Sequence, residues 1–247
     1  MPHGPVMGQL TGDQIMKFFN PEPAICTALL LSSFCCHASG LTLGATRLIY
    51  SEGAKEATVP LSNGSEKVPY LIQSWVSDLD GKSENIPFIT TPPVFKLLQN
   101  KVTAVRVVNV SDVAQPLPQD KESVWLLNVR AIPAVEKQAN PARMTVSTQN
   151  IIKLIYRPKG LTAKAAGNAW SQQQVSKGSG FITVTNPTPY VVTLTRMNIN
   201  GENIDKPGLV MPFATKRIET SVKNPSAISF SIIDDYGGIS PKKNINL

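Results

Sequence analysis

The sequence of residues 144–158, M-T-V-S-T-Q-N-I-I-K-L-I-Y-R-P, is the strongest strand signal in the chain. Met144, Val146 and Thr148 alternate with polar residues, which is the period of a strand with one apolar side. The second half of the run is more continuously apolar, and Lys153 lies inside it. A cation there is costly unless it reaches solvent, is paired or receives an anionic ligand. The stretch therefore predicts a strand to which a strand of another chain can pair, and a cation, Lys153, that needs a partner.

The length and composition predict two β-rich domains. A chain of 247 residues can form two domains, each with its own core. Hydrophobic residues make up 42% and charged residues only 17%, which favours strands over long solvent-facing helices. No helical period of three turns or more is visible. We therefore predict an all-β fold, and the spacing of the turn signals is typical of an immunoglobulin-like sandwich, although a barrel has a similar pattern.

The expected strands form two series. In the first domain they are residues 41–50, 57–61, 70–76, 94–98, 102–110, 124–132 and the opening stretch; in the second they are 180–186, 191–199, 208–213, 215–220 and 227–233. The prolines of residues 87–93 exclude a central strand there and allow a cis bond before Pro92 or Pro93. Residues 159–168 are rich in Lys, Ala, Gly and Asn, which indicates the connection between the domains.

The N-terminal segment has the pattern of a secretory signal. Residues 24–34 form an apolar run of 11 residues, and small residues follow it. We expect residues 1–39 to be a signal peptide, with residues 1–15 an over-extended start because Met16 opens a more natural one. The remaining domains are then 40–158, the connection 159–168, and 169–247. A membrane anchor is the alternative, and the run is short for it.

Cysteine and histidine are confined to the predicted signal. All three cysteines and both histidines precede residue 40. The exported chain therefore lacks the residues for disulfides, thiolate nucleophiles, Ser-His-Asp triads and ordinary zinc sites. A nucleotide-binding G-x-x-x-x-G-K-[ST] motif is also absent. We predict no cofactor, no metal and no enzymatic activity. A secreted hydrolase using carboxylates or a Ser-Lys pair is the alternative. Asp234 and Asp235 are the only adjacent acidic pair in the exported chain and would face opposite ways on a strand, and Ser-x-x-Lys patterns are too common to be informative.

The exported chain is basic without a concentrated basic patch. Residues 40–247 carry 23 cations and 15 acids, a formal charge of +8. Basic charge can indicate a nucleic-acid partner, but here Lys and Arg are spread along the chain without runs of five. We therefore predict neither nucleic-acid binding nor membrane insertion.

Ordered sequence blocks resemble the periplasmic chaperones of chaperone–usher pili. The blocks are T-R-L-I-Y at 46–50, P-Y-L-I-Q-S-W-V at 69–76, T-P-P-V-F-K-L at 91–97, L-P-Q-D-K-E-S at 117–123, W-L-L-N-V at 125–129, I-K-L-I-Y-R-P at 152–158, N-P-T-P-Y at 186–190, M-P-F at 211–213 and D-Y-G-G at 235–238. The short loop at 134–143 fits the short-loop branch of the family. The resemblance implies two immunoglobulin-like domains in an L or boomerang arrangement around a cleft.

The resemblance also implies a function. Such a chaperone binds fimbrial subunits, completes their fold by donor-strand complementation and delivers them to an outer-membrane usher without ATP. Arg47 and Lys153 match the family's two cleft cations, which anchor the terminal carboxylate of a subunit. Without the resemblance they would be two unrelated surface cations. A secreted two-domain immunoglobulin-like adhesion module is the alternative, and a self-capping dimer of the free protein is left open.

Two further sets of residues take their roles from the resemblance. Met144, Val146 and Thr148 match the donor strand, where Thr148 departs from the larger aliphatic residue usual in the family. A second set matches charges that the family places near the domain junction: Arg106, Glu122, Arg157 and Asp235. Such a buried set would fix the relative orientation of the domains more than it would add stability.

Overall fold

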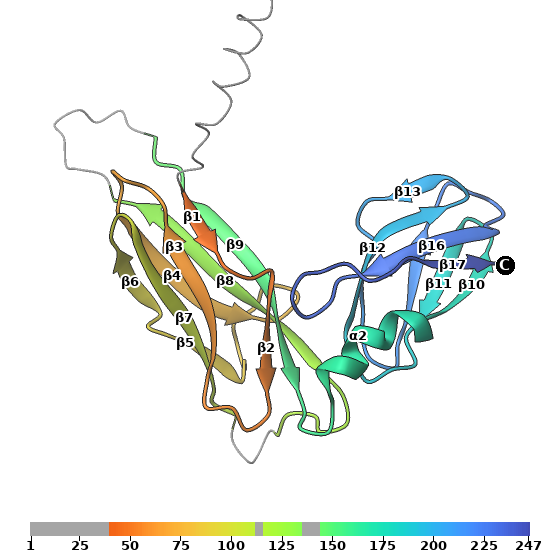
Figure 1. Cartoon of the computed structure of the whole chain (residues 1–247), viewed down its shortest axis with the longest axis horizontal. Coiled ribbons are helices and arrows are strands. Elements are labelled where there is room, and N and C mark those ends of the chain that lie inside the picture. The colour runs from red at the N-terminus through yellow and green to blue at the C-terminus, as the bar shows by residue number, and fades with distance from the viewer. Residues whose placement is uncertain (1–39, 112–115, 135–143) are drawn as a thin grey trace, which may run out of the picture. The chain divides into compact units, whose positions relative to one another are not determined.

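Two β-sandwiches follow one another along the chain in the computed structural model, which describes residues 40–111, 116–134 and 144–247 (Figure 1). One sheet of the first sandwich has the order β1 (Leu41–Leu43), β3 (Ala57–Asn63), β7 (Lys101–Asn109) and β5 (Phe88–Thr91). The other has the order β2 (Arg47–Ser51), β9 (Thr148–Arg157), β8 (Ser123–Pro133), β4 (Tyr70–Ser77) and β6 (Val94–Leu97). The predicted all-β fold with immunoglobulin-like sandwiches is confirmed.

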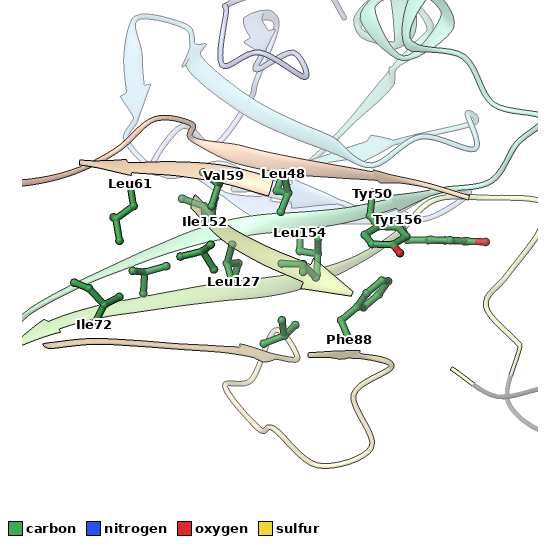
Figure 2. Packing of buried hydrophobic residues seen from close by; sticks show 14 of the residues in the cluster. Leu48, Tyr50, Val59, Leu61, Ile72, Phe88, Leu127, Ile152, Leu154 and Tyr156 are labelled. Atoms are coloured by element: carbon green, nitrogen blue, oxygen red, sulfur yellow. The ribbon is translucent and has the colours of Figure 1, made fainter. Parts of the chain in front are cut away.

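The first core lies between these two sheets. Side chains from β3, such as Val59 and Leu61, lie opposite Leu127 of β8 and Leu154 of β9, and all four are fully buried (Figure 2). Every second residue of each strand enters this layer because successive side chains of a strand point to opposite faces. The residues between them are left on the outer face of the sheet, and this alternation places the charged residues described below.

The chain changes sheets where one continuous strand was predicted. Residues 41–50 form two strands, since β1 pairs with β3 in one sheet and β2 pairs with β9 in the other. The change occurs at Gly44, whose N–H donates to the Pro60 carbonyl at 2.8 Å. A side chain at Gly44 would come within 3.1 Å of the Pro60 ring. The single-strand prediction was wrong because it missed a change of phase: Leu41, Leu43 and Ala45 face the core before the crossover, and Leu48 and Tyr50 after it.

The predicted strand at 144–156 begins later in the structure. Residues 144–147 are exposed and belong to no strand, and β9 starts at Thr148. The alternation of Met144 and Val146 was therefore wrongly assigned to a strand of the isolated chain. The two side chains have no sheet of their own to cover, because β8 pairs with β9 only as far as Thr148.

The second sandwich also has two sheets. One contains β10 (Gln174–Gly178), β11 (Phe181–Thr185) and β15 (Thr215–Glu219). The other has the order β13 (Glu202–Ile204), β12 (Val192–Ile199), β16 (Ala227–Ile232) and β17 (Lys243–Asn246), and β14 (Gly208–Val210) also pairs with β12. The strands β10, β13 and β17 were not predicted. Their exposed, polar residues carry little apolar alternation.

A helix occupies much of the predicted connection at 159–168. Helix α2 (Ala163–Gln172) begins at Thr162, whose hydroxyl accepts the Ala165 N–H at 3.2 Å. Lys243 donates from its amine to two carbonyls at the end of the helix, those of Ser171 and Gln173, at 2.6 Å each. The helix is shorter than three turns and buries only Ala169, so its apolar period was too short to detect.

The predicted signal peptide, residues 1–39, lies outside the described residues. Within the part of the chain that the structure covers, no helix is long and apolar enough to cross a membrane. The predicted cis bond is found before Pro92.

Candidate functional site

Arg47 and Lys153 lie side by side on neighbouring strands. The strands β2 and β9 run parallel, and their register pairs these two residues directly. Leu48 and Leu154, the next residues along each strand, are buried in the first core. Arg47 and Lys153 therefore share the opposite, outer face of the sheet, on strands about 4.8 Å apart.

The Arg47 guanidinium is buried and only partly used. Arg47 is only 7% exposed, and its Nη1 donates a hydrogen bond to the Ile233 carbonyl at 2.9 Å. The Nε donor is buried and has no acceptor among the described residues. Burial lowers the pKa of Arg47, while the nearby charges of Asp235, Asp234 and Glu122 act against this shift. A buried N–H on a cation that has no acceptor favours the binding of an anionic acceptor.

Lys153 is half-buried beside Arg47. Its amine has no hydrogen bond or ion pair within the described ranges. Burial lowers the pKa of Lys153, and the positive charge of Arg47 lowers it further. An anion bound between the two cations would relieve both effects, because an opposite charge within hydrogen-bonding distance favours the charged form.

Three of the four predicted junction charges meet in the structure. Arg157 donates from Nε to Glu122 at 2.6 Å, and from Nη1 and Nη2 to the two oxygens of Asp235 at 2.6 and 2.9 Å. The second oxygen of Glu122 accepts the Val191 N–H at 2.7 Å. Glu122 and Arg157 come from the first sandwich and Asp235 from the second, so these bonds join the two.

The electrostatics of this network reflect its burial. Burial lowers the pKa of Arg157, but the hydrogen bonds and charges of Asp235 and Glu122 outweigh it, and the net shift is upward. Burial also raises the pKa of Glu122, and the Arg157 charge and the Val191 N–H oppose that rise. The hydrogen bonds and opposite charges of these partners therefore offset the cost of burying each charged group.

Arg106 does not belong to this network, which corrects the prediction. It lies on β7 in the other sheet and its closest carboxylate is Glu56, at 3.7 Å. Both side chains of this pair are about half exposed, at 56% and 46%. Arg106 alternates with buried Val105 and Val107, and this places it on the solvent face of its strand.

The N-terminal half of β9 is an edge of its sheet. The strand β8 pairs with residues 148–156 of β9, whereas β2 pairs only with residues 153–157. Residues 148–152 therefore have one side without a neighbouring strand among the described residues. Ile151 is 54% exposed here. A groove of about 440 Å³ lies beside this edge, lined by Leu41, Thr42, Leu43, Ala45, Thr46, Asn150, Ile151 and Ile152.

The three predicted donor residues are exposed at this end of β9. Met144 is 90% exposed, Val146 is 63% exposed, and Thr148 is exposed as the first residue of the strand. Exposed apolar side chains that lie close together are typical of a surface that meets a partner. The predicted donor residues, the free edge and Lys153 thus follow one another along residues 144–153, and Arg47 lies beside Lys153 on β2.

Comparison with known proteins identifies the family. Residues 40–162 match the N-terminal domain, and residues 168–244 the C-terminal domain, of the PapD pili and flagellar-assembly chaperones. The chain belongs to this family of pilus-assembly chaperones. This confirms the predicted chaperone class, and the relatives are named as chaperones and not as enzymes.

Similar chaperones cover nearly the whole chain. The chain is 37% identical over 223 residues to the probable fimbrial chaperone ElfD of Escherichia coli K12, covering 88% of this chain and 93% of ElfD. Among solved structures, the SafB chaperone of Salmonella enterica, in complex with the SafA pilin, superposes with a TM-score of 0.73 at 29% identity and covers 85% of this chain and 98% of SafB. The periplasmic chaperone SfaE gives 0.67 at 30% identity, covering 84% and 100%.

Sequence reasoning missed two features of the site in this pilus chaperone. One is the Ile233 carbonyl that holds Arg47, because a backbone acceptor leaves no mark on residue type. The other is the groove beside β9, which forms only because β1 leaves the sheet of β2. Within the described ranges, no group of three or more His, Cys, Asp or Glu side chains could hold a metal ion.

Proposed function

We propose that this chaperone captures pilus subunits in the periplasm by binding their terminal carboxylate at Arg47 and Lys153. The observation that carries the proposal is the pairing of the two cations on one rung of a parallel ladder, with a buried, unused N–H on Arg47. Two cations on one carboxylate give charge-assisted hydrogen bonds, which are strong where water is partly excluded.

The subunit then continues along the free edge of β9. A strand added beside residues 148–152 would pair with the backbone groups that β2 leaves unpaired, by β-augmentation. Met144, Val146 and Thr148 act as the donor strand, and they fill the groove of a subunit that lacks its own last strand. This supports a chaperone more than a secreted adhesion module, since an adhesion module has no need of two cations next to a free edge.

Handover to an outer-membrane usher completes the proposed cycle. The chain carries no nucleotide-binding motif of the G-x-x-x-x-G-K-[ST] type, so release proceeds by exchange with the next subunit and without ATP. We propose that residues 1–39 are removed on export. The mass of the protein recovered from periplasm tests this cleavage. The mass should correspond to a chain that starts near Ala38 to Gly40, and a chain that retains residue 20 would contradict the cleavage.

Co-expression in periplasm tests the function. The chaperone is tagged and expressed with a fimbrial subunit encoded beside it, and the two should co-purify as a one-to-one complex. A matched subunit carries two extra C-terminal residues, which move its terminal carboxylate away from the two cations. This subunit should be recovered poorly. Equal recovery of both subunits would contradict the carboxylate anchor, and recovery of neither would contradict subunit capture.

A further inference from the structure

Tyr236 has the most exposed aromatic side chain in the described part of the chain. It is 91% exposed, whereas the next, Phe213, is 57% exposed. An exposed aromatic ring does not contribute the hydrophobic stabilisation that its burial would give. Tyrosines of this kind are enriched where a protein meets a partner.

The turn that carries Tyr236 is held by hydrogen bonds. The Asp234 carboxylate accepts the N–H groups of Tyr236 and Gly238 at 2.9 and 2.7 Å. The backbone of Asp234 also exchanges bonds with Gly237 and Gly238, and Gly237 adopts a φ of 86° that favours glycine. The ring is therefore presented from a fixed backbone, so ordering it against a partner costs little further entropy.

The same turn is attached to both strands that carry the cations. Asp235, the neighbour of Tyr236, is bound by Arg157 at the end of β9. Gly237, its other neighbour, lies against Thr46, the residue before β2, and an added Cβ would lie 2.6 Å from the Thr46 hydroxyl. The Ile233 carbonyl accepts from Arg47 itself. Tyr236 therefore lies between two residues that contact the immediate surroundings of Arg47.

We infer that Tyr236 is a second contact for the bound subunit, with its ring packing on the last one or two residues of the chain whose carboxylate Arg47 and Lys153 hold. This inference rests on the proposed function, since it needs a carboxyl terminus at the cations. The contact is close to the anchor, because the turn directly follows Ile233, whose carbonyl accepts from Arg47. The ring favours apolar side chains at those last positions and gives the anchor a selectivity that two point charges lack.

A double-mutant cycle tests this contact. Binding to a synthetic peptide that copies the C-terminal strand of the co-purified subunit is measured by calorimetry for wild type, Tyr236→Ala and Tyr236→Phe. Phe213→Ala is the control for losing an exposed aromatic elsewhere. Two further peptides are compared with this native one. In the first the last two residues are replaced by glycines, and in the second the C-terminus is amidated.

Tyr236→Ala should weaken the native peptide about tenfold and the glycine-ended peptide less than about twofold, because only the native end meets the ring. Tyr236→Phe and Phe213→Ala should bind like wild type. Equal losses on both peptides, or no loss, would overturn the inference. The amidated peptide separates the two proposals: if wild type binds it as well as the acid, the carboxylate anchor itself is wrong, whereas Tyr236→Ala should keep the acid preference.

Discussion

Arg47 and Lys153 occupy the same rung of the ladder between β2 and β9, so two cations stand side by side on one face of a sheet. Like charges on adjacent strands repel, and burial adds to the cost for both. No carboxylate among the described residues pairs with either cation, although Arg157, on the same strand β9, has two. The protein thus pairs the charge that joins its sandwiches and leaves free the two that we assign to a ligand.

Removing the Lys153 charge should weaken capture without unfolding the protein. Lys153→Met keeps the apolar stem and loses the cation, so the subunit complex should lose about 1.5 to 3 kcal/mol, roughly tenfold to hundredfold in affinity. The melting midpoint of the free protein should stay or rise, because a desolvated charge is removed. Lys159→Met, an exposed lysine just beyond β9, is the control. Wild-type affinity in Lys153→Met would remove Lys153 from the anchor.

The affinity for a subunit should fall at alkaline pH. The pKa of Lys153 is lowered in the free protein and rises when a carboxylate binds, so above the free pKa binding must also take up a proton. Affinity is therefore full below this pKa and falls as pH rises through it. Lys153→Arg stays charged and should show no such fall when both are titrated by calorimetry. If the affinities of wild type and Lys153→Arg fall in parallel as pH rises, Lys153 does not take up a proton on binding.

The stability of the free protein should depend on Lys153 with the opposite sign. Because the folded pKa is below the unfolded one, the unfolded chain binds more protons between the two values, and stability rises with pH in that window. The difference in unfolding free energy between wild type and Lys153→Met, measured by urea denaturation, should shrink as pH increases there. A difference that is constant across this range would contradict the lowered pKa.

Glu122 should matter for stability and Arg106 should not. Glu122→Ala leaves the buried Arg157 with one partner and the Val191 N–H with none, which should cost about 3 to 5 kcal/mol. Arg106→Ala removes only a half-exposed pair and should change stability by less than about 1 kcal/mol. Thermal melts separate these outcomes. Equal midpoints for the two variants would show that the junction network carries no stability.

The strands with clear apolar alternation and the class of protein could be predicted from the sequence, whereas the polar strands β10, β13 and β17 could not. The register that pairs Arg47 with Lys153 could not, since one residue of slip would place the two on different rungs. Arg106 was misplaced for a related reason: sequence similarity suggested a set of charges, but only the sheet assignment of β7 shows which of them can meet. Thr46 and Tyr236 became informative only when the turn at Asp234 to Gly238 was seen to lie against β2.

The donor residues should be needed for the complex and not for the free protein. Replacing both Met144 and Val146 with Asp should remove two apolar plugs, each worth about 1.5 to 3 kcal/mol when fully buried. Both side chains are exposed in the free protein, so its melting midpoint should not change. A lowered midpoint would mean that they pack within the chaperone itself.

Thr148 offers the reverse test. Thr148→Ile adds apolar volume at the position where this chain departs from the family pattern, and should strengthen the subunit complex by about 1 kcal/mol. The rate of subunit exchange against a peptide copying a subunit extension reports the change, and it should slow. Faster exchange would show that the pocket facing Thr148 has no room for the larger side chain.

Amide hydrogen exchange along β9 tests the central claim most directly. In the free protein, the amides of residues 148–152 that do not bond to β8 should exchange quickly, because that edge has no neighbouring strand among the described residues. In the purified subunit complex these amides should become protected, while those of residues 153–156, already paired on both sides, should change little. Unchanged exchange at residues 148–152 in the complex would contradict strand addition at this edge.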